Sequence, residues 1–281
     1  MKIMWIIKNL ICRIGRRLYM FGRGDNANIM EKNGELFLQE QFLLELKLHE
    51  NSDKKIIIFD VGANIGEWSI AMHTLAKKLN IDHRINLYQF EPVGSTFKNL
   101  KNNLQNLGIH STVERLALSS EDGEAEIFIS HENAGTNSLH KDSTNNSEVE
   151  SILINKIDTY CKTHNLDRVN FIKCDAEGHD FEVIKGAYKM LESGAIDLLQ
   201  FEYNHRWIFS GHSFKQVFDL IDGTSYLLAK IQPEYLLFFN EWHPELDRFF
   251  EGNYALVHKD MESRFPAKYA DFDKSNVYRI R

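Results

Sequence analysis

Cysteine and proline are scarce in this sequence. The three cysteines, Cys12, Cys161 and Cys174, are far apart and odd in number, which indicates a reducing compartment and argues against a disulfide framework. No C-x-x-C pair occurs, so a zinc site made of thiolates is not expected. Only four prolines interrupt the 281 residues. This length fits one large domain with extra elements, or one domain with a small appendage.

Positive charge is not in excess either. Lys and Arg number 33 against 40 Asp and Glu, a formal net charge of −7. A nucleic-acid clamp is typically basic, so no nucleic-acid partner is expected. Hydrophobic residues make up 43% of the chain, including 19 Phe. A core of considerable size can therefore be buried.

The N-terminal 24 residues differ from the rest in carrying no acid before Asp25. Their basic residues are Lys2, Lys8, Arg13, Arg16, Arg17 and Arg23, and a helix would align Ile3, Ile7, Leu10, Ile11, Ile14, Leu18 and Phe21 on another face. Charges interrupt the run too often for it to span a bilayer, and no signal-peptide cleavage pattern follows it. The sequence predicts a cytoplasmic protein. It leaves two roles open for residues 1–23: contact with an anionic surface, such as the inner face of a membrane, or packing on its own domain or in a homo-oligomer.

Strand and helix patterns alternate through most of the chain. Strands are predicted at 56–61, 85–90, 112–118, 169–174 and 196–201, and helices at 36–49, 65–79, 94–107, 157–164, 180–192 and 214–221. Such alternation predicts a mostly parallel, doubly wound α/β sheet that binds ligands at the carboxyl ends of its strands.

Other strands are predicted outside this alternation. Segments 226–231, 236–239 and 254–258 lie close together and predict an antiparallel C-terminal hairpin, and segments 124–130 and 148–154 flank a polar loop over 134–147. The expected organisation is a helical extension over 1–50, a domain over 51–260 and a tail over 261–281.

The motif Asp60-Val-Gly62-Ala63-Asn64-Ile-Gly66 follows the first predicted strand. Gly62 permits a tight turn against a ligand, and Gly66 permits close approach of the next helix. The third glycine of a dinucleotide-binding G-x-G-x-x-G is absent. Asp60 suits the cationic groups of S-adenosylmethionine (SAM) better than a pyrophosphate, which favours SAM over NAD.

Glu91 ends the second predicted strand and precedes Pro92. An acid at this position can accept hydrogen bonds from both hydroxyls of a ribose. Ala117 and Leu118 follow at the end of the third predicted strand, where they are placed either to border an adenine ring or simply to pack in the core.

These residues, with Lys173-Cys-Asp-Ala-Glu-Gly-His-Asp180 and Gln200-Phe-Glu-Tyr203, resemble the FkbM family of class I methyltransferases over roughly residues 55–258. The resemblance implies a Rossmann-like fold with a seven-stranded sheet. It also implies SAM as methyl donor and a hydroxyl of a sugar or glycosylated metabolite as acceptor. One departure is Asp180, which stands where the family usually has the longer acid.

Five residues past the fourth and fifth predicted strands are candidate catalytic groups: Asp175, Glu177, His179, Glu202 and His205. The carboxyl ends of neighbouring parallel strands converge, so these residues could share one cleft. An alcohol must lose a proton during methylation, and either a histidine or a carboxylate with a raised pKa could accept it. The carboxylates of Asp175, Glu177 and Glu202 could instead hold a divalent cation. Asp175 is also counted among the SAM-binding residues.

Ser138, Tyr203 and Trp207 are the predicted walls of an acceptor pocket, because polar and aromatic groups suit a sugar. Core packing is the alternative for each aromatic residue. Two other functions stay open: a SAM-binding, membrane-associated scaffold without activity, and an NAD-dependent oxidoreductase.

Overall fold

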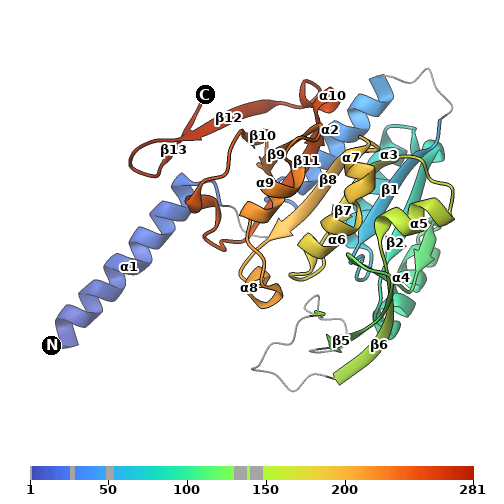
Figure 1. Cartoon of the computed structure of the whole chain (residues 1–281), viewed down its shortest axis with the longest axis horizontal. Helices are drawn as coiled ribbons and strands as arrows, with labels where there is room; N and C mark the ends of the chain where they lie inside the picture. The colour runs from blue at the N-terminus through green and yellow to red at the C-terminus, as the bar shows by residue number, and fades with distance from the viewer. Residues whose placement is uncertain (1, 26–28, 49–53, 130–137, 140–147) are drawn as a thin grey trace.

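A computed structural model describes residues 2–25, 29–48, 54–129, 138–139 and 148–281, and its main feature is one large sheet (Figure 1). Ten strands hydrogen-bond in the order β13-β12-β10-β9-β11-β8-β7-β1-β2-β3. Their bounds are β1 Ile56–Val61, β2 Ile85–Phe90, β3 Thr112–Glu114, β7 Val169–Cys174, β8 Ile196–Tyr203, β9 Tyr226–Ile231, β10 Leu236–Phe239, β11 Gly252–His258, β12 Ala267–Phe272 and β13 Tyr278–Ile280.

The direction of the strands matches the predicted α/β class. Strands β3, β2, β1, β7 and β8 are parallel, while β11 lies antiparallel between β8 and β9. The predicted hairpin is present as β9 and β10. The chain therefore has the Rossmann-like fold of class I methyltransferases, with the seven-stranded part running from β3 to β9.

Three strands extend this seven-stranded part. β12 pairs with β10, and β13 pairs with β12, so residues expected as a tail after residue 260 belong to the sheet. The sequence did not indicate β12 because only Ala270 of its six residues is buried. β12 lies between β10 and β13 and is held mainly by backbone hydrogen bonds, so its side chains show little hydrophobic alternation to recognise.

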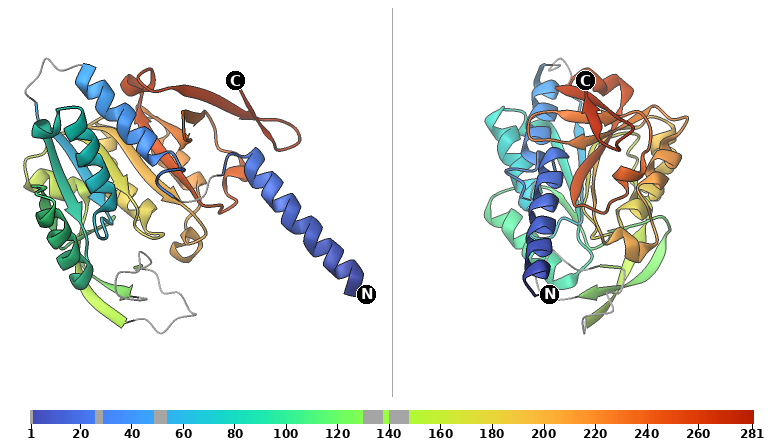
Figure 2. Two further views of the ribbon diagram at one scale, coloured as in Figure 1. Left: turned by 180° about the vertical axis from the view of Figure 1, so that it is seen from behind. Right: turned by 90° about the vertical axis from the view of Figure 1, so that its left-hand side faces the viewer.

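Helices cover both faces of the sheet (Figure 2). One face carries α2 (Glu35–Leu48), α3 (Glu67–Lys78), α4 (Gly94–Asn106) and α10 (Lys259–Glu262). The other carries α5 (Ile157–Thr163), α6 (Asp180–Gly186), α7 (Tyr188–Glu192), α8 (Trp207–Ser210) and α9 (Lys215–Ile221). Two short 3₁₀ turns, η1 (Asp82–Arg84) and η2 (Pro244–Leu246), complete these elements. The central strands β1, β7 and β8 are buried on both sides, which explains their largely apolar sequences.

A second, three-stranded sheet has the order β4-β6-β5, with β4 Ala117–Leu118, β5 Gly123–Ile129 and β6 Glu148–Asn155. The strand predicted over 112–118 is thus divided between the two sheets. The predicted strands around the polar loop are present as β5 and β6. Of that loop only Ser138 and Leu139 lie within the described residues; the remainder, including 134–137, lies outside them.

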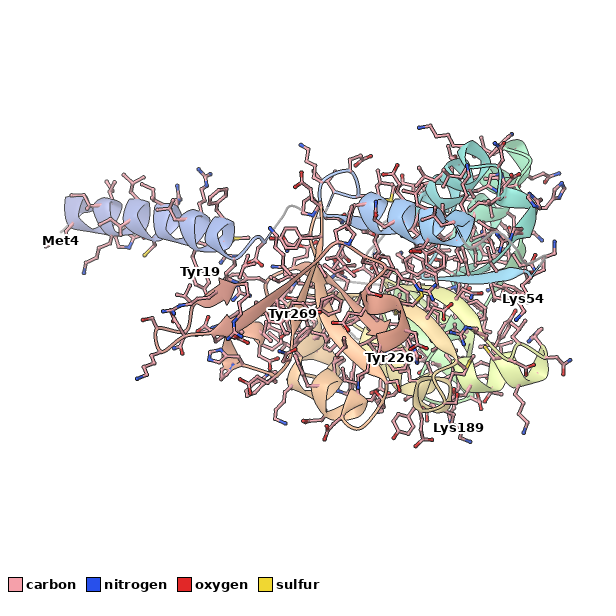
Figure 3. The ribbon with its side chains drawn as sticks, turned by 90° about the horizontal axis from the view of Figure 1, so that it is seen from above. Met4, Tyr19, Lys54, Lys189, Tyr226 and Tyr269 are labelled. Atoms are coloured by element: carbon pink, nitrogen blue, oxygen red, sulfur yellow. The ribbon has the colours of Figure 1, made fainter. Side chains whose placement is uncertain are left out.

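Helix α1 (Lys2–Gly22) projects from the body of the molecule (Figures 1 and 3). No helix in the described ranges is long and apolar enough to cross a membrane.

Candidate active site

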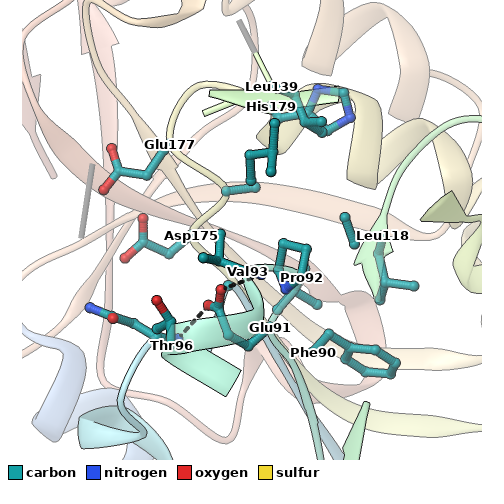
Figure 4. Close-up of a pocket in the computed structure, with 16 residues that line it drawn as sticks. Phe90, Glu91, Pro92, Val93, Thr96, Leu118, Leu139, Asp175, Glu177 and His179 are labelled. Carbon is teal, nitrogen blue, oxygen red and sulfur yellow. Dashed lines mark hydrogen bonds between the residues drawn. The ribbon is translucent and has the colours of Figure 1, made fainter. Parts of the chain in front are cut away.

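A cavity opens at the carboxyl ends of β1, β2 and β7, beside the small sheet (Figure 4). The empty space within it is about 800 Å³, a volume that includes solvent at its open mouth. Its walls are Val61, Gly62, Asn64, Phe90, Glu91, Pro92, Val93, Thr96, Ala117, Leu118, Ile127, Leu139, Asp175, Ala176, Glu177 and His179. Residues predicted from three separate motifs therefore meet in one place.

Gly62 shapes the floor of this cavity. Its φ is 72°, and a Cβ on this residue would lie 2.0 Å from the carbonyl oxygen of Asp175. Only glycine fits such a turn against the end of β7. Gly66 has a similar role at the start of α3, where a Cβ would lie 2.8 Å from Leu100 Cδ1. Ala63 and Gly66 are absent from the cavity walls, so they support the turn without facing a ligand.

Glu91 is a buried carboxylate facing the cavity. Its Oε2 accepts a hydrogen bond from the backbone N–H of Asn64, and its Oε1 accepts one from the N–H of Val93, both at 3.0 Å. Burial raises the pKa of Glu91 to about 7, against the effect of these two hydrogen bonds. Each oxygen of a carboxylate can accept more than one hydrogen bond, so the group retains capacity for a diol.

Asp60 does not line the cavity, contrary to the sequence prediction. It is fully buried, where Ser69 Oγ donates to its Oδ2 at 2.7 Å and Lys173 Nζ lies 3.7 Å from its Oδ1. Side chains alternate along a strand, and this alternation turns Asp60 toward the face covered by α3. Asp60 therefore holds the base of the turn.

Asp175 takes the position expected of Asp60. Its carboxylate lines the cavity, its side chain is 38% exposed, and its Oδ2 lies 3.3 Å from Lys173 Nζ. Burial acts to lower the pKa of Lys173, but the carboxylates of Asp175 and Asp60 outweigh that effect and raise it. Lys173 is consequently a permanent buried cation that orients both acids. Sequence reasoning had not assigned it a role.

The apolar wall of the cavity contains the predicted Pro92, Ala117 and Leu118. Sequence reasoning missed Phe90, Val93, Thr96, Ile127 and Leu139, which also line it. Ile127 and Leu139 reach the cavity only because the small sheet folds beside β2, and no local pattern records that arrangement. Phe90 and Leu118 face the cavity opposite Asp175 and Glu177 (Figure 4), as a flat aromatic ligand between apolar and acidic walls would require.

Glu177 lies on the acidic side of the cavity in an unusual backbone conformation. Its φ is 53°, and Gly178 follows at φ 92°. Its carboxylate lies 2.9 Å from Arg206 Nη1, and its carbonyl oxygen accepts a hydrogen bond from Ser138 Oγ at 2.9 Å. Burial, with the charge of Asp175 second, raises the pKa of Glu177 to about 8. A carboxylate with such a pKa is suited to proton transfer.

Asp180 holds this turn in place. It is almost fully buried, and its carboxylate accepts hydrogen bonds from the backbone N–H groups of Ala176, Gly178 and Glu202. The shorter acid thus connects the turn after β7 to the end of β8. Left-handed residues at a site persist only when surrounding contacts enforce them, and Asp180 supplies those contacts.

The two predicted histidines lie in different environments. His179 lines the cavity, with its Nε2 2.9 Å from Ser119 Oγ. His205 is exposed and is not part of the cavity wall. The segment after β8 turns His205 outward, because the neighbouring Trp207 packs into the core instead.

Glu202 also lies outside the cavity wall. It is 5% exposed, and its Oε2 accepts a hydrogen bond from Asn204 Nδ2 at 2.6 Å. Burial, with the charge of Asp175 second, raises its pKa well above the usual range. Of the five candidate catalytic groups, Asp175, Glu177 and His179 line the cavity, and Glu202 and His205 do not.

Tyr203 and Trp207 are core residues and do not form acceptor walls. Both are fully buried. Tyr203 Oη donates to Asp247 Oδ1 at 3.0 Å, and Trp207 Nε1 donates to the carbonyl oxygen of Glu202 at 3.0 Å. The Tyr203 ring packs against the rings of Trp207 and Phe214 on the face covered by α6, α8 and α9. Of the three predicted acceptor residues, only Ser138 lies beside the cavity.

The arrangement does not fit a divalent cation. Within the described ranges, no three His, Cys, Asp or Glu side chains come together as a metal site. Three carboxylates face the cavity: Asp175 and Glu177 pair with Lys173 and Arg206, and Glu91 accepts hydrogen bonds from the backbone N–H groups of Asn64 and Val93. Each therefore already has a partner within the protein, and Glu202 does not line the cavity.

Known proteins resemble this chain in sequence and in fold. The hexuronic acid methyltransferase AglP of Haloferax volcanii is 30% identical over 154 residues, which are 55% of this chain and 59% of that protein. The chain thus spans less than two thirds of this relative. Among solved structures, the magnesium protoporphyrin IX methyltransferase ChlM of Synechocystis covers 90% of this chain and 95% of its own, with 10% identity and a TM-score of 0.39. An rRNA methylase of Streptococcus thermophilus covers 79% and 95%, with 11% identity and a TM-score of 0.41.

Structural likeness at these scores carries no information on the chemistry of this chain. The family comparison is more specific, because the model of the methyltransferase FkbM domain matches residues 60–228. That range includes the glycine turn, Glu91 and the acidic turn after β7. The chain belongs to the FkbM methyltransferase family.

Proposed function

We propose that this protein transfers a methyl group from SAM to a hydroxyl of a sugar, either in a glycan or in a glycosylated metabolite. The observation that carries the proposal is the pairing of Glu91 and Asp175 in one cavity. Glu91 can accept the two hydroxyls of the ribose, while Asp175 offers a negative charge to the ammonium and sulfonium groups. Ala117 and Leu118 supply an apolar border for the adenine.

Glu177 is the proposed proton acceptor. Methyl transfer is an in-line displacement in which the acceptor oxygen attacks the methyl carbon from the side opposite the sulfur. A sugar hydroxyl loses its proton in this step, and Glu177 lies beside Asp175 on the acidic wall (Figure 4). Its raised pKa of about 8 gives it the basicity that the step needs near neutral pH.

A sugar acceptor is supported by the relative AglP, which is described as a hexuronic acid methyltransferase. A hexuronic acid offers two acceptor types, its hydroxyls and its carboxylate. A carboxylate is already ionised near pH 7 and needs no general base. The position and raised pKa of Glu177 favour the hydroxyl.

The test uses the full chain, methyl-labelled SAM and a panel of oligosaccharides with and without uronic acids. We expect label in at least one sugar as a methyl ether, which survives mild alkali. Label that mild alkali releases identifies an ester and contradicts the hydroxyl proposal. Calorimetry with SAM and NAD tests the donor: binding of NAD alone favours an oxidoreductase. SAM binding without transfer to any glycan in the panel or in a cell extract favours a scaffold.

Glu91→Gln should weaken SAM binding and remove its pH dependence. With the pKa of Glu91 at about 7, protonation at lower pH removes the ribose acceptor, so wild-type affinity is lost as the pH falls through that value. We expect about tenfold weaker binding at pH 6 than at pH 8, measured by calorimetry. At pH 8 the variant should bind SAM at least about tenfold more weakly than the wild type, because a charge-assisted hydrogen bond is lost. At pH 6, where Glu91 of the wild type is protonated, the two proteins should bind SAM with similar affinity.

Glu234→Gln is the matched control, because Glu234 is exposed and lies outside the cavity wall. It should retain the affinity and pH profile of the wild type. If Glu91→Gln still shows the wild-type dependence of SAM affinity on pH, a group other than Glu91 is responsible for that dependence.

Exhaustive chelation should leave methyl transfer unchanged. Asp175 is paired with Lys173 and Glu177 with Arg206, so the proposed reaction uses no divalent cation. Initial rates with EDTA, and after dialysis against it, measure this directly. Loss of activity that Mg²⁺ restores would contradict the prediction.

A further inference from the structure

Helix α1 presents an apolar stripe that no other described part of the chain covers. The stripe consists of Met4, Ile7, Leu10, Ile11, Ile14, Leu18 and Phe21, each between 49% and 85% exposed. At about 100° per residue these side chains share an arc of roughly 120° on one side of the helix. So large a contiguous apolar surface on a soluble domain typically marks an interaction site.

The opposite side of α1 attaches the helix to the domain. Arg16 lies over the ring of Phe250 at 5.2 Å, and Tyr19 contacts the same ring at 5.9 Å. Tyr19 Oη donates a hydrogen bond to Glu245, and Arg23 Nη1 donates to the carbonyl oxygen of Glu245 at 2.8 Å. These contacts hold the base of the helix, which projects from the domain (Figure 3), and they leave its apolar stripe exposed. The sequence left open that the stripe packs on its own domain. The structure does not have this packing, because the stripe residues are exposed.

The charges on α1 indicate what covers the stripe. The first 24 residues contain six Lys and Arg and no acid, in a chain whose net charge is −7. Lys8 and Arg17 border the stripe on its two sides, at about 80° and 260° on the same helical wheel. A basic side chain beside an apolar stripe can extend to a phosphate while the stripe enters the acyl region.

We propose that α1 binds the surface of an anionic phospholipid membrane, with the helix lying in the interface. The described helices do not span a bilayer, so attachment at the surface is the geometry this helix can adopt. A second copy of the chain fits less well, because pairing two stripes would bring the bordering Lys8 and Arg17 of both copies together. A nucleic acid would leave the apolar stripe in water. The inference does not rest on the proposed function.

The experiment is co-sedimentation of the full chain with vesicles of phosphatidylcholine alone, or of phosphatidylcholine with phosphatidylglycerol. We expect about tenfold or stronger binding to the anionic vesicles, weakened by salt. Leu10→Gln/Ile14→Gln removes two members of the stripe without changing charge and should reduce binding about tenfold or more. Asn9→Gln/Cys12→Gln alters two positions off the stripe and should bind as the wild type does.

Both variants should keep the wild-type urea midpoint, because Leu10, Cys12 and Ile14 are exposed and Asn9 is not among the buried residues. Equal binding to the two kinds of vesicle overturns the proposal, and so does wild-type binding by Leu10→Gln/Ile14→Gln. Analytical ultracentrifugation without lipid tests whether a second copy of the chain covers the stripe instead. A dimer that Leu10→Gln/Ile14→Gln converts to monomer overturns it in favour of a second copy of the chain.

Discussion

Glu177→Gln should lower kcat for methyl transfer by about 10²- to 10⁴-fold, the usual contribution of a general base. The amide keeps the size of the side chain but cannot accept the proton of the hydroxyl. SAM affinity should change little, because Glu91 and Asp175 carry the proposed donor contacts. Rates with the sugar that the panel identifies, and calorimetry with SAM, separate the two effects.

Glu202→Gln is the matched comparison for this experiment. Glu202 is also a glutamate at the end of a parallel strand. It accepts a hydrogen bond from Asn204, however, and it does not line the cavity. Its variant should keep kcat within a few-fold of the wild type. The opposite ranking, with Glu202→Gln the slower enzyme, would move the base to Glu202.

The pH profile provides a second readout of the same assignment. A base with a pKa of about 8 is mostly protonated at pH 6 and ionised above pH 9. Wild-type kcat/KM should therefore rise with pH until about pH 8 and then level off, after allowance for SAM binding. The Glu177→Gln variant should lack this rise.

Gly62→Ala should destabilise the fold by roughly 2 to 5 kcal/mol and abolish SAM binding. The new methyl group would lie 2.0 Å from the carbonyl oxygen of Asp175, so β7 or the turn must move. Overpacking of this kind costs about 1 to 3 kcal/mol, and the left-handed φ of 72° adds about 1 to 2 kcal/mol. Urea unfolding followed by circular dichroism measures the loss.

Gly211→Ala separates these two costs. Gly211 has a φ of 73°, but no heavy atom lies within 4 Å of its ideal Cβ position. This variant carries only the backbone cost of about 1 to 2 kcal/mol and should bind SAM normally. If the two variants lose equal stability, the contact with Asp175 is not what requires glycine at position 62.

Most of the central sheet could be predicted from local patterns. The runs that became β1, β7 and β8 are buried on both faces, and that burial makes them largely apolar. Gly62 could also be recognised, because a tight turn after a buried strand has few other solutions. The positions of Glu91, Asp175 and Glu177 followed from the rule that parallel strands carry ligands at their carboxyl ends.

The roles of individual side chains depended on more than their position in the chain. Asp60 and Asp175 both stand near strand ends, but Asp60 turns under α3 toward Lys173 and only Asp175 faces the cavity. Tyr203 and Trp207 stand at and just after the end of β8, where a binding loop would begin, yet their rings pack against each other in the core. Which face a side chain takes is settled by strand alternation and by the helices above it.

The sequence by itself determined the fold class, the glycine turn and the set of acids at one edge of the sheet. It did so because burial periodicity and backbone conformation are local properties. Only the tertiary structure decided that Lys173 and Arg206 pair with Asp175 and Glu177, that β12 joins the sheet, and that the apolar stripe of α1 faces away from the domain. Each depends on contacts between segments distant in the chain, and no local pattern specifies such contacts.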